Sequence, residues 1–599
     1  MEAAFAAVRL GCSTLLLTQN LDTIGQMSCN PAIGGLAKGH IVREIDALGG
    51  FMGRNADATG IQFRMLNRSR GISVRAPRAQ CDKKAYQSRA KRALEECEGL
   101  EVKQAAVIAV RVDNDHRVTG VETDIGLLIS ARAVVITSGT FLGAILHVGD
   151  ISKPGGRMGD AVSGLSGSLR QLGVAVGRFK TGTPCRLNSR SIDFSACEIQ
   201  VGDVPPPRFS YLLHRSGEND TAGFHVEQLP CWITHTTSKT HDIIRQNLQQ
   251  SPFYSGRIEG VGPRYCPSIE DKVVKFSEKL RHQLFLEPEG RETHEIYVNG
   301  VSTSLPYPVQ LEFIRTIPGL RNAEIMRPGY AVEYDYFPPT QLMATLESKV
   351  IGGVFFAGQV NGTSGYEEAA AQGLIAGANA ALALKGAAPL ILSRRDAYIG
   401  VLVDDLVTKG VNEPYRMFTS RSEDRLSLRQ DNADQRLTPI GQAVGLVDQE
   451  RWEHFRTKIR LIDSARHLAS TTIIGTTPLS HLLKHPQFNQ KNLPADVAGA
   501  VPAEVWEIIE ADYKNEGYVR RQESQNRHLA SRDCQPIPDG FDFSLIQGLR
   551  AETRQKLGVT RPTKLGDAAR VSGVTPADVA IISVWLAKQG TPSAALASS

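Results

Sequence analysis

The chain has 599 residues, of which 41% are hydrophobic and 22% charged, and its formal charge at pH 7 is +5. One hydrophobic core does not support a chain of this length, so we expect three or four domains. These fractions are ordinary for a globular protein. No apolar run reaches the roughly 18 residues of a membrane span, and the acidic Glu2 stands where a signal peptide carries basic residues. We therefore predict a cytoplasmic protein with no membrane contact.

The nine cysteines are scattered along the chain and form no Cys-x-x-Cys pair. An odd and dispersed set argues against a disulfide framework and for a reducing compartment. Cys231, His235 and His241 are of metal-ligand type, but no second close thiol completes a four-ligand zinc set. The sequence therefore predicts no metal site.

The first elements indicate part of a βαβ unit. Residues 2–10 predict a short alanine-rich helix that stops at Gly11, and residues 14–17 predict a strand. Next comes the loop 27–35, in which Cys29 precedes Asn30-Pro31 and the pair Gly34-Gly35. We expect the turn at Asn30-Pro31 to hold the thiol off a helix that begins near Ile33. Cys29 is either a nucleophile beside a planar ligand or a small residue buried in a tight turn.

Basic residues are concentrated between residues 64 and 92, where Asp82 is the single acid. This density is typical of a surface for a polyanion, and a solvated helix face explains it equally well because aromatic residues are few. The basic residues are Arg64, Arg68, Arg70, Arg75, Arg78, Lys83, Lys84, Arg89, Lys91 and Arg92.

Two apolar runs that end in glycine turns predict a dinucleotide site. Residues 133–137 precede Ser138-Gly139-Thr140, and residues 354–357 precede a turn at 358–362, followed by a helix from Tyr366. This arrangement is typical of a doubly wound fold, in which the helix N-terminus binds a pyrophosphate or a flavin pyrimidine edge. Ordinary α/β packing is the alternative. In that helix, Gly373 and Gly377 share one face, which we expect to lie against a sheet or ligand.

The two glycine turns are separated in sequence, so the first domain is split around an insertion. Before the insertion, residues 102–112 and 117–122 are expected to form a hairpin. Inside it, a second thiol, Cys266, lies between Arg264 and a helix start at Ser268 in the segment 260–272. A cation and a helix N-terminus both favour a thiolate. Two such loops in one chain favour catalytic cysteines over structural ones.

Amphipathic helical patterns such as 448–465 and 503–529 dominate after about residue 390. The fold class we predict is α/β, a split doubly wound FAD-binding domain with an inserted mixed α/β domain and an all-helical C-terminal domain. The expected boundaries are 1–184 and 337–389 for the split domain, 185–336 for the insertion and 390–599 for the helical part.

Several long motifs of this chain resemble the bacterial MnmG (GidA) family nearly word for word, and the resemblance covers essentially the whole chain. These motifs are MSCNPAIGGLAKGHIVREIDALGG, KTGTPCR, IEGVGPRYCPSIEDK, FLEPEG, RPGYAVEYDY, FFAGQVNGTSGYEEAAAQG and EPYRMFTSRSEDRL. The resemblance implies an FAD- and NADH-dependent enzyme that works with the GTPase MnmE as a heterotetramer. Such enzymes install a carboxymethylaminomethyl group at C5 of the tRNA wobble uridine. The carbon comes from methylenetetrahydrofolate, and glycine or ammonium supplies the nitrogen.

The resemblance also assigns roles to residues. Cys29 and Cys266 match the two important cysteines of the family, and Val107, Ser163 and Gln359 fall at its FAD positions. The helical C-terminal part is expected to hold MnmE and tRNA, the basic stretch 64–92 to offer a second tRNA surface, and the protein to form a homodimer. The NAD segment corresponds to Gly262, Pro263, Arg264, Tyr265, Cys266, Pro267, Ser268, Ile269, Glu270, Asp271, Lys272, Val273, Val274, Lys275 and Phe276.

The chain departs from the family at its beginning. Family members start further upstream, with a strand and a Gly-Gly-Gly-His-Ala-Gly turn that holds the FAD pyrophosphate, and residues 2–4 match the positions just after that turn. We expect a misplaced start codon, with a truncated, non-catalytic scaffold for tRNA or a GTPase as the alternative. The folate-dependent tRNA uracil-5-methyltransferase is the nearest enzyme alternative, but it lacks a long helical C-terminal part.

Overall fold

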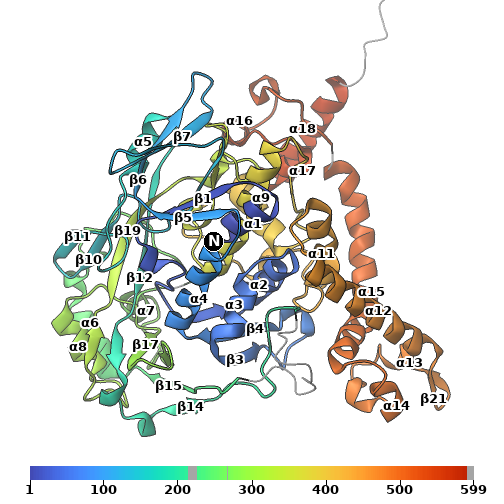
Figure 1. Ribbon diagram of the computed structural model, residues 1–599, viewed down its shortest axis with the longest axis horizontal. Helices are drawn as coiled ribbons and strands as arrows, with labels where there is room; N and C mark the ends of the chain where they lie inside the picture. Colours follow the sequence, from blue (N-terminus) through green and yellow to red (C-terminus); the bar gives the residue numbers. More distant parts are fainter. Residues whose placement is uncertain (213–225, 266, 534, 572, 590–599) are drawn as a thin grey trace, which may run out of the picture.

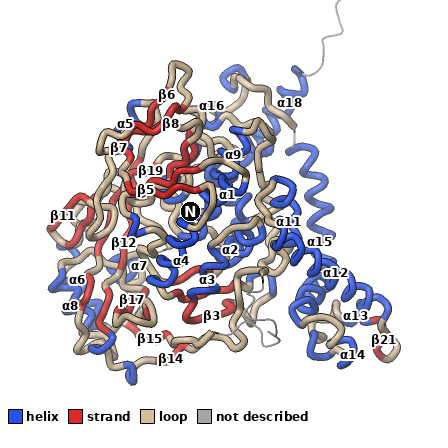
Figure 2. The backbone as a smooth tube through the Cα atoms, viewed as in Figure 1, coloured by secondary structure: helices blue, strands red, loops and turns tan. Residues whose placement is uncertain are grey.

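The computed structural model describes residues 1–212, 226–265, 267–533, 535–571 and 573–589. Strands concentrate in one body of the molecule, and helices from the last third of the chain form an arm along its side (Figures 1 and 2). The predicted combination of an α/β body with a helical C-terminal part is confirmed.

Two pairs of parallel strands lie within the α/β body. β1 (Thr14–Thr18) pairs with β5 (Leu100–Gln104), and β9 (Val134–Ile136) pairs with β20 (Val354–Phe356). The predicted pairing of β9 with β20, which lie more than 200 residues apart in the sequence, is therefore confirmed. The single strand expected over 102–112 is wrong, because the chain leaves the first pair at Ala105, whose N–H donates to Thr18, and only then enters β6 (Val107–Val112).

Antiparallel sheets complete the body. The strand orders are β2-β4-β3, β6-β7-β8 and β11-β10-β19-β12. The remaining bounds are β2 (Ala32–Gly34), β3 (Gly60–Leu66), β4 (Ala76–Cys81), β7 (Val118–Thr123), β8 (Leu128–Ser130), β10 (Ile145–Val148), β11 (Ile151–Pro154), β12 (Gly177–Thr183) and β19 (Tyr330–Tyr336). The helices here are α1 (Glu2–Arg9), α2 (Lys38–Ala47), α3 (Met52–Thr59), α4 (Lys83–Glu95), α5 (Leu165–Gln171) and α9 (Tyr366–Leu384).

The inserted segment forms its own antiparallel sheet of order β14-β15-β16-β17-β13-β18. Apolar side chains from this sheet and its helices make a second core, separate from that of the first part. The bounds are β13 (Arg186–Asn188), β14 (Glu198–Gln200), β15 (Cys231–His235), β16 (Gln283–Pro288), β17 (Glu295–Asn299), β18 (Ile325–Arg327), α6 (Ser238–Gln246), α7 (Ile269–Lys275) and α8 (Tyr307–Ile314).

The first helices of the C-terminal part pack against the α/β body. The first core continues to Leu446, so α10 (Tyr398–Asp404) and α11 (Ala433–Val444) pack on that body although they follow the expected boundary at residue 389. Two further apolar clusters follow along the chain, one from Ile462 to Ile509 and one from Ile537 to Ile582. Within the described residues, no helix is both long and apolar enough to cross a membrane. The remaining elements are α12 (Gln449–Thr471), α13 (Leu479–Leu482), α14 (Ala495–Ala498), α15 (Ala503–Asp533), α16 (Ala551–Thr560), α17 (Leu565–Arg570), α18 (Pro576–Gln589), and the two-residue strands β21 (Ile473–Ile474) and β22 (Thr477–Pro478).

Helix α9 lies directly on helix α1, and two glycines allow different degrees of approach. A Cβ added at Gly377 would overlap the carbonyl oxygen of Ala3, whereas at Gly373 the nearest atom, the Ala3 nitrogen, lies at 3.6 Å. The glycine face that was expected to lie against a sheet or a ligand packs on helix α1.

We predict that Gly377→Ala lowers the free energy of unfolding by about 1–3 kcal/mol, because the methyl group must displace the α1 backbone. Gly373→Ala is the matched control and should be neutral or stabilising by up to about 1 kcal/mol, the helix-propensity gain. Denaturant unfolding of the two variants measures both values, and equal effects would contradict the close packing at Gly377.

Candidate active site

The Cys29 loop leads into strand β2, and its conformation depends on glycine. Gly34 and Gly35 both have positive φ, and a Cβ at Gly34 would overlap the carbonyl oxygen of Pro77. β2 pairs antiparallel with β4, and helix α2 begins only at Lys38. The helix expected near Ile33 is therefore wrong, because the left-handed glycines end a short strand there.

The first turn of α9 holds the main chain of this loop. The Tyr366 hydroxyl accepts a hydrogen bond from the Cys29 N–H at 2.7 Å and donates to the Asn30 carbonyl at 3.3 Å. The Glu367 carboxylate accepts from the Gly34 N–H at 2.7 Å and pairs with Lys38 at 2.8 Å. The helix predicted to face a cofactor thus also positions the thiol loop.

A buried carboxylate, Glu289, lies behind the loop and is shared by two cations. Lys83 contacts it at 2.6 Å and Arg186 at 3.0 Å. Both cations also donate to the loop: Lys83 to the Cys29 carbonyl at 2.8 Å and Arg186 to the Ser28 carbonyl at 3.2 Å. Lys83 begins α4, Arg186 lies on β13 and Glu289 follows β16, so this triad joins the inserted sheet to the first part.

The two cations and one carboxylate leave a surplus of positive charge. Burial lowers the pKa of Lys83 to about 8, although Glu289 acts in the opposite direction. Burial also opposes ionisation of Glu289, yet Lys83 and Arg186 together hold the pKa of its carboxyl below the ordinary value. Glu289 therefore stays ionised, and the site favours negative charge on a nucleophile or a substrate.

Tyr297 of β17 is the side chain that touches the thiol. Its hydroxyl oxygen lies 3.0 Å from the Cys29 sulfur, and the residue is 3% exposed. The guanidinium of Arg186 lies 5.0 Å from the centre of the Tyr297 ring, within cation–π range. The thiol therefore lies where the inserted sheet meets the α/β part.

The start of α9 has the properties of a site for a neutral acceptor. The backbone N–H groups of Tyr366, Glu367 and Glu368 find no acceptor among the described residues. The carboxylates of Glu367 and Glu368 share one cation, Lys38. Two carboxylates with one cation disfavour a pyrophosphate here and favour an uncharged acceptor, such as a flavin pyrimidine carbonyl. The residues present therefore fit the ring end of a flavin.

The three expected FAD positions fall in two places. The Ser163 hydroxyl donates to the Val107 carbonyl at 3.2 Å, so these two residues contact each other. Gln359 lies in the turn before α9, and its amide donates to the Tyr334 hydroxyl at 3.0 Å. Among the described residues, no hydrogen bond joins Gln359 to Val107 or Ser163.

Part of the segment expected to bind NAD forms helix α7 and packs into the second core. Ser268 caps α7 as predicted, and Ile269 and Val273 are buried in the second core. Glu270 accepts from the Thr303 hydroxyl at 2.9 Å. Cys266 lies outside the described residues. A ligand can reach the exposed members of the segment, namely Arg264, Tyr265, Val274, Lys275 and Phe276.

Of the ten basic residues between 64 and 92, some form ion pairs with acidic residues and others form none with the acids that the structure describes. Arg78 pairs with the buried Glu287 at 2.8 Å, and Lys83 belongs to the site described above. Three more have acidic partners: Arg68 with Asp203, Lys91 with Asp22 and Arg92 with Glu96. In the described part of the chain, no acid lies within ion-pair distance of Arg64, Arg70, Arg75, Lys84 and Arg89.

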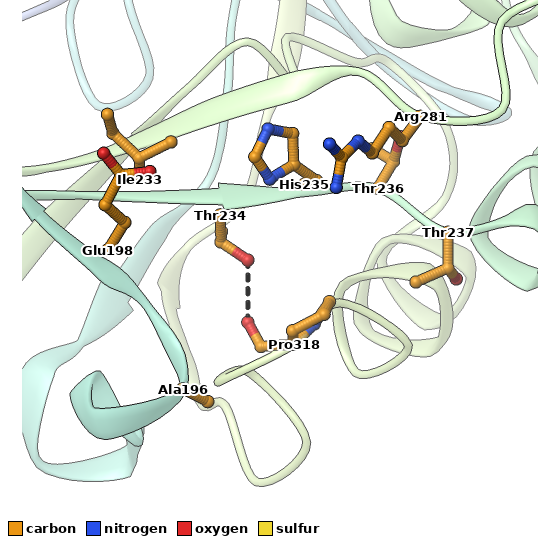
Figure 3. Close-up of a pocket in the computed structure, with 9 residues that line it drawn as sticks. All are labelled: Ala196, Glu198, Ile233, Thr234, His235, Thr236, Thr237, Arg281 and Pro318. Carbon is orange, nitrogen blue, oxygen red and sulfur yellow. Dashed lines mark hydrogen bonds between the residues drawn. The ribbon is translucent and has the colours of Figure 1, made fainter.

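A hollow of about 400 Å³ lies in the inserted part, away from these residues (Figure 3). The Thr234 hydroxyl donates to the Pro318 carbonyl across it at 2.9 Å. None of the predicted site residues that the structure describes lines this hollow. The lining residues are Ala196, Glu198, Ile233, Thr234, His235, Thr236, Thr237, Arg281 and Pro318.

The sequence pattern identified Cys29, but it did not identify its partners. Arg186 and Glu289 belong to the motifs KTGTPCR and FLEPEG and Tyr297 to a strand, but nothing in these segments links them to Cys29, and Lys83 was counted only as one of ten basic residues. Their signal is spatial, since each is more than 50 residues from Cys29 along the chain.

Comparison with known proteins agrees with the resemblance noted in the sequence. The family model for glucose inhibited division protein A matches residues 1–388, and the model for the tRNA modifying enzyme MnmG/GidA C-terminal helical bundle matches residues 525–597. Two proteins named tRNA uridine 5-carboxymethylaminomethyl modification enzyme MnmG are similar along their length. The one from Protochlamydia amoebophila is 54% identical over 99% of this chain and 94% of its own, and the one from Geobacter sulfurreducens is 52% identical over 99% and 96%.

Solved structures give the same result. Aquifex aeolicus GidA superimposes with a TM-score of 0.90 in one crystal form, at 48% identity over 98% of this chain and 97% of its own. A second crystal form gives a TM-score of 0.89 at 47% identity, over 98% and 96%. The chain therefore belongs to the glucose inhibited division protein A family, the MnmG/GidA family.

Proposed function

We propose that this chain is an FAD-dependent tRNA-modifying enzyme that builds a 5-carboxymethylaminomethyl group on the wobble uridine of tRNA. The family membership supports the reaction class, and the observation that carries the proposal is the thiol of Cys29. This thiol is held by groups from both parts of the molecule, in a site with surplus positive charge. A cysteine used only for packing needs no such surroundings.

The chemistry assigned to the cysteines is addition to the uracil ring. One thiolate, of Cys29 or Cys266, adds to C6 of the uridine, and C5 then becomes nucleophilic and attacks the incoming one-carbon unit. The other thiol handles the transferred carbon or a proton. The surplus positive charge of Lys83 and Arg186 suits the negative charge that this addition develops on the ring.

Flavin fits the start of α9, where three backbone N–H groups are available to a carbonyl acceptor. FAD would be held there and at Gln359, Val107 and Ser163, and when bound it supplies hydride transfer. We assign NADH to the exposed side chains of the segment 262–276 and the one-carbon unit to methylenetetrahydrofolate. The buried Ile269 and Val273 would support that segment without touching the ligand.

We also propose a division of labour along the chain. Residues 1–184 and 337–389 bind FAD, 185–336 bind NADH and substrate, and 390–599 bind tRNA and the GTPase MnmE. The unpaired cations Arg70, Arg75 and Lys84 would add a second contact to the tRNA backbone. A homodimer that assembles with MnmE in the cytoplasm completes the proposal.

The proposed role of Cys29 is tested with the Cys29→Ser variant, because serine keeps the size of the side chain and removes the thiolate chemistry. We expect loss of the modified uridine by at least about a hundredfold, in line with removal of a nucleophile. Nucleoside mass spectrometry of tRNA from cells that carry each variant measures this. Cys97→Ser is the matched control and should modify tRNA normally, and full modification by Cys29→Ser would refute the nucleophile role.

The pKa of Lys83 predicts a pH dependence. Below a pKa of about 8 the side chain is an ammonium group, and above it the positive charge is lost. The turnover rate should therefore fall as pH rises through about 8. In Lys83→Arg this fall in the turnover rate should move to higher pH, because a guanidinium stays charged throughout the range. The control Lys84→Arg, at the exposed neighbouring position, should show the same fall in rate near pH 8 as the wild type. An unchanged pH profile in Lys83→Arg would contradict the claim that the charge of Lys83 causes the fall.

A further inference from the structure

We propose that the Tyr297 hydroxyl keeps its proton and donates a hydrogen bond to the Cys29 thiolate, so that the inserted sheet sets the reactivity of a thiol carried by the other part. This inference rests on the proposed function only for the use of the thiol, because the pairing itself is a property of the free protein. Tyr297 is a positioning residue in this account, since it acts on the substrate through Cys29.

Tyr297 is held rigidly, which a defined contact to sulfur requires. It lies on β17, between β16 and β13 in the six-stranded sheet, and its register partners are Arg186 and Glu287. The O–S separation of 3.0 Å is short enough for a hydrogen bond to sulfur. On the other side, Tyr366 fixes the Cys29 N–H. The sulfur and the hydroxyl therefore face each other from two anchored backbones.

The direction of the bond follows from the acidities of the two groups. A thiol is ordinarily a stronger acid than a phenol, by roughly 1.5 pKa units, so the first proton that such a pair loses comes from sulfur and the phenol keeps its own. The proton that the thiol loses passes to solvent water, and Tyr297 remains a neutral donor. A hydrogen bond to a charged acceptor is about twice as strong as one between neutral groups, so the thiolate form gains more.

The charged and titratable groups around the pair favour the same charge distribution. Three carboxylates close to the loop or to Tyr297 each pair with a cation: Glu367 with Lys38, Glu287 with Arg78 and Asp160 with Arg157. The guanidinium of Arg157 also donates to the Ser28 hydroxyl at 3.0 Å. The remaining groups include more cations than carboxylates. They are Lys83 of α4, Arg186 of β13, Glu289 after β16, Tyr330 of β19 and Tyr366 of α9.

The test is the rate at which iodoacetamide alkylates Cys29 in the full-length protein between pH 6 and pH 10, followed by mass spectrometry of the Cys29 peptide. In Tyr297→Phe we expect the half-maximal rate to move up by about one pH unit, with about tenfold slower alkylation at pH 7. Tyr307→Phe, on the exposed side of α8, is the matched control and should follow the wild-type profile. A Tyr297→Phe profile that superimposes on the wild type would overturn the proposal.

A second measurement keeps the test valid if Tyr297→Phe fails to fold. With 3-fluorotyrosine incorporated at position 297, the side chain keeps its shape and its phenol becomes a stronger donor. At pH 7, where this phenol is still protonated, alkylation of Cys29 should then be faster than in the wild type, opposite to the effect of phenylalanine, and an unchanged rate would also overturn the proposal.

The outcomes separate this inference from the proposed function. If Cys29→Ser still modifies tRNA while Tyr297→Phe shifts the alkylation profile, the role of Cys29 in the reaction is wrong and the pairing stands. If Cys29→Ser is inactive and the alkylation profile does not move, the proposed function stands and the pairing is wrong.

Discussion

The structure of the site depends on one buried carboxylate that serves two cations from different parts of the chain. Glu289 is 7% exposed and binds Lys83 and Arg186. Both cations also donate hydrogen bonds to carbonyl groups of the Cys29 loop. Removing one partner of a buried ion pair leaves an uncompensated charge and typically costs about 3–5 kcal/mol. The interaction therefore couples the docking of the inserted sheet to the position of the thiol.

Helix α9 makes the complementary connection on the other side of the loop. Its first-turn side chains, Tyr366 and Glu367, hold the loop, while the backbone N–H groups of the same turn are available to an acceptor. A flavin ring at those N–H groups and the thiol loop would thus share one rigid support. The close packing of α9 on α1 through Gly377 extends this support into the first core.

The sequence predicted those features that depend on local pattern. The parallel strands around 134–136 and 354–356, the start of α9 at Tyr366 and the Ser268 cap all follow from short-range hydrophobic runs and capping residues. The helix expected near Ile33 failed because Gly34 and Gly35 both have positive φ, and the Pro77 carbonyl lies close to Gly34 and accepts from the Gly35 N–H, contacts that no local pattern records. Lys83 shows the same limit: a run of basic residues predicts a charged surface, but only the fold shows which cation binds the buried Glu289.

The central claim is that the contact centred on Glu289 holds the Cys29 loop. Hydrogen exchange of the peptide covering residues 27–35, in Glu289→Gln and in the wild type, tests it most directly. The control is Glu324→Gln, an exposed carboxylate of the inserted part that accepts a hydrogen bond from the Asn188 amide. The account predicts exchange at least about tenfold faster in this peptide for Glu289→Gln, with the α9 peptide 370–384 unchanged. Equal protection of the loop in Glu289→Gln and the wild type would contradict it.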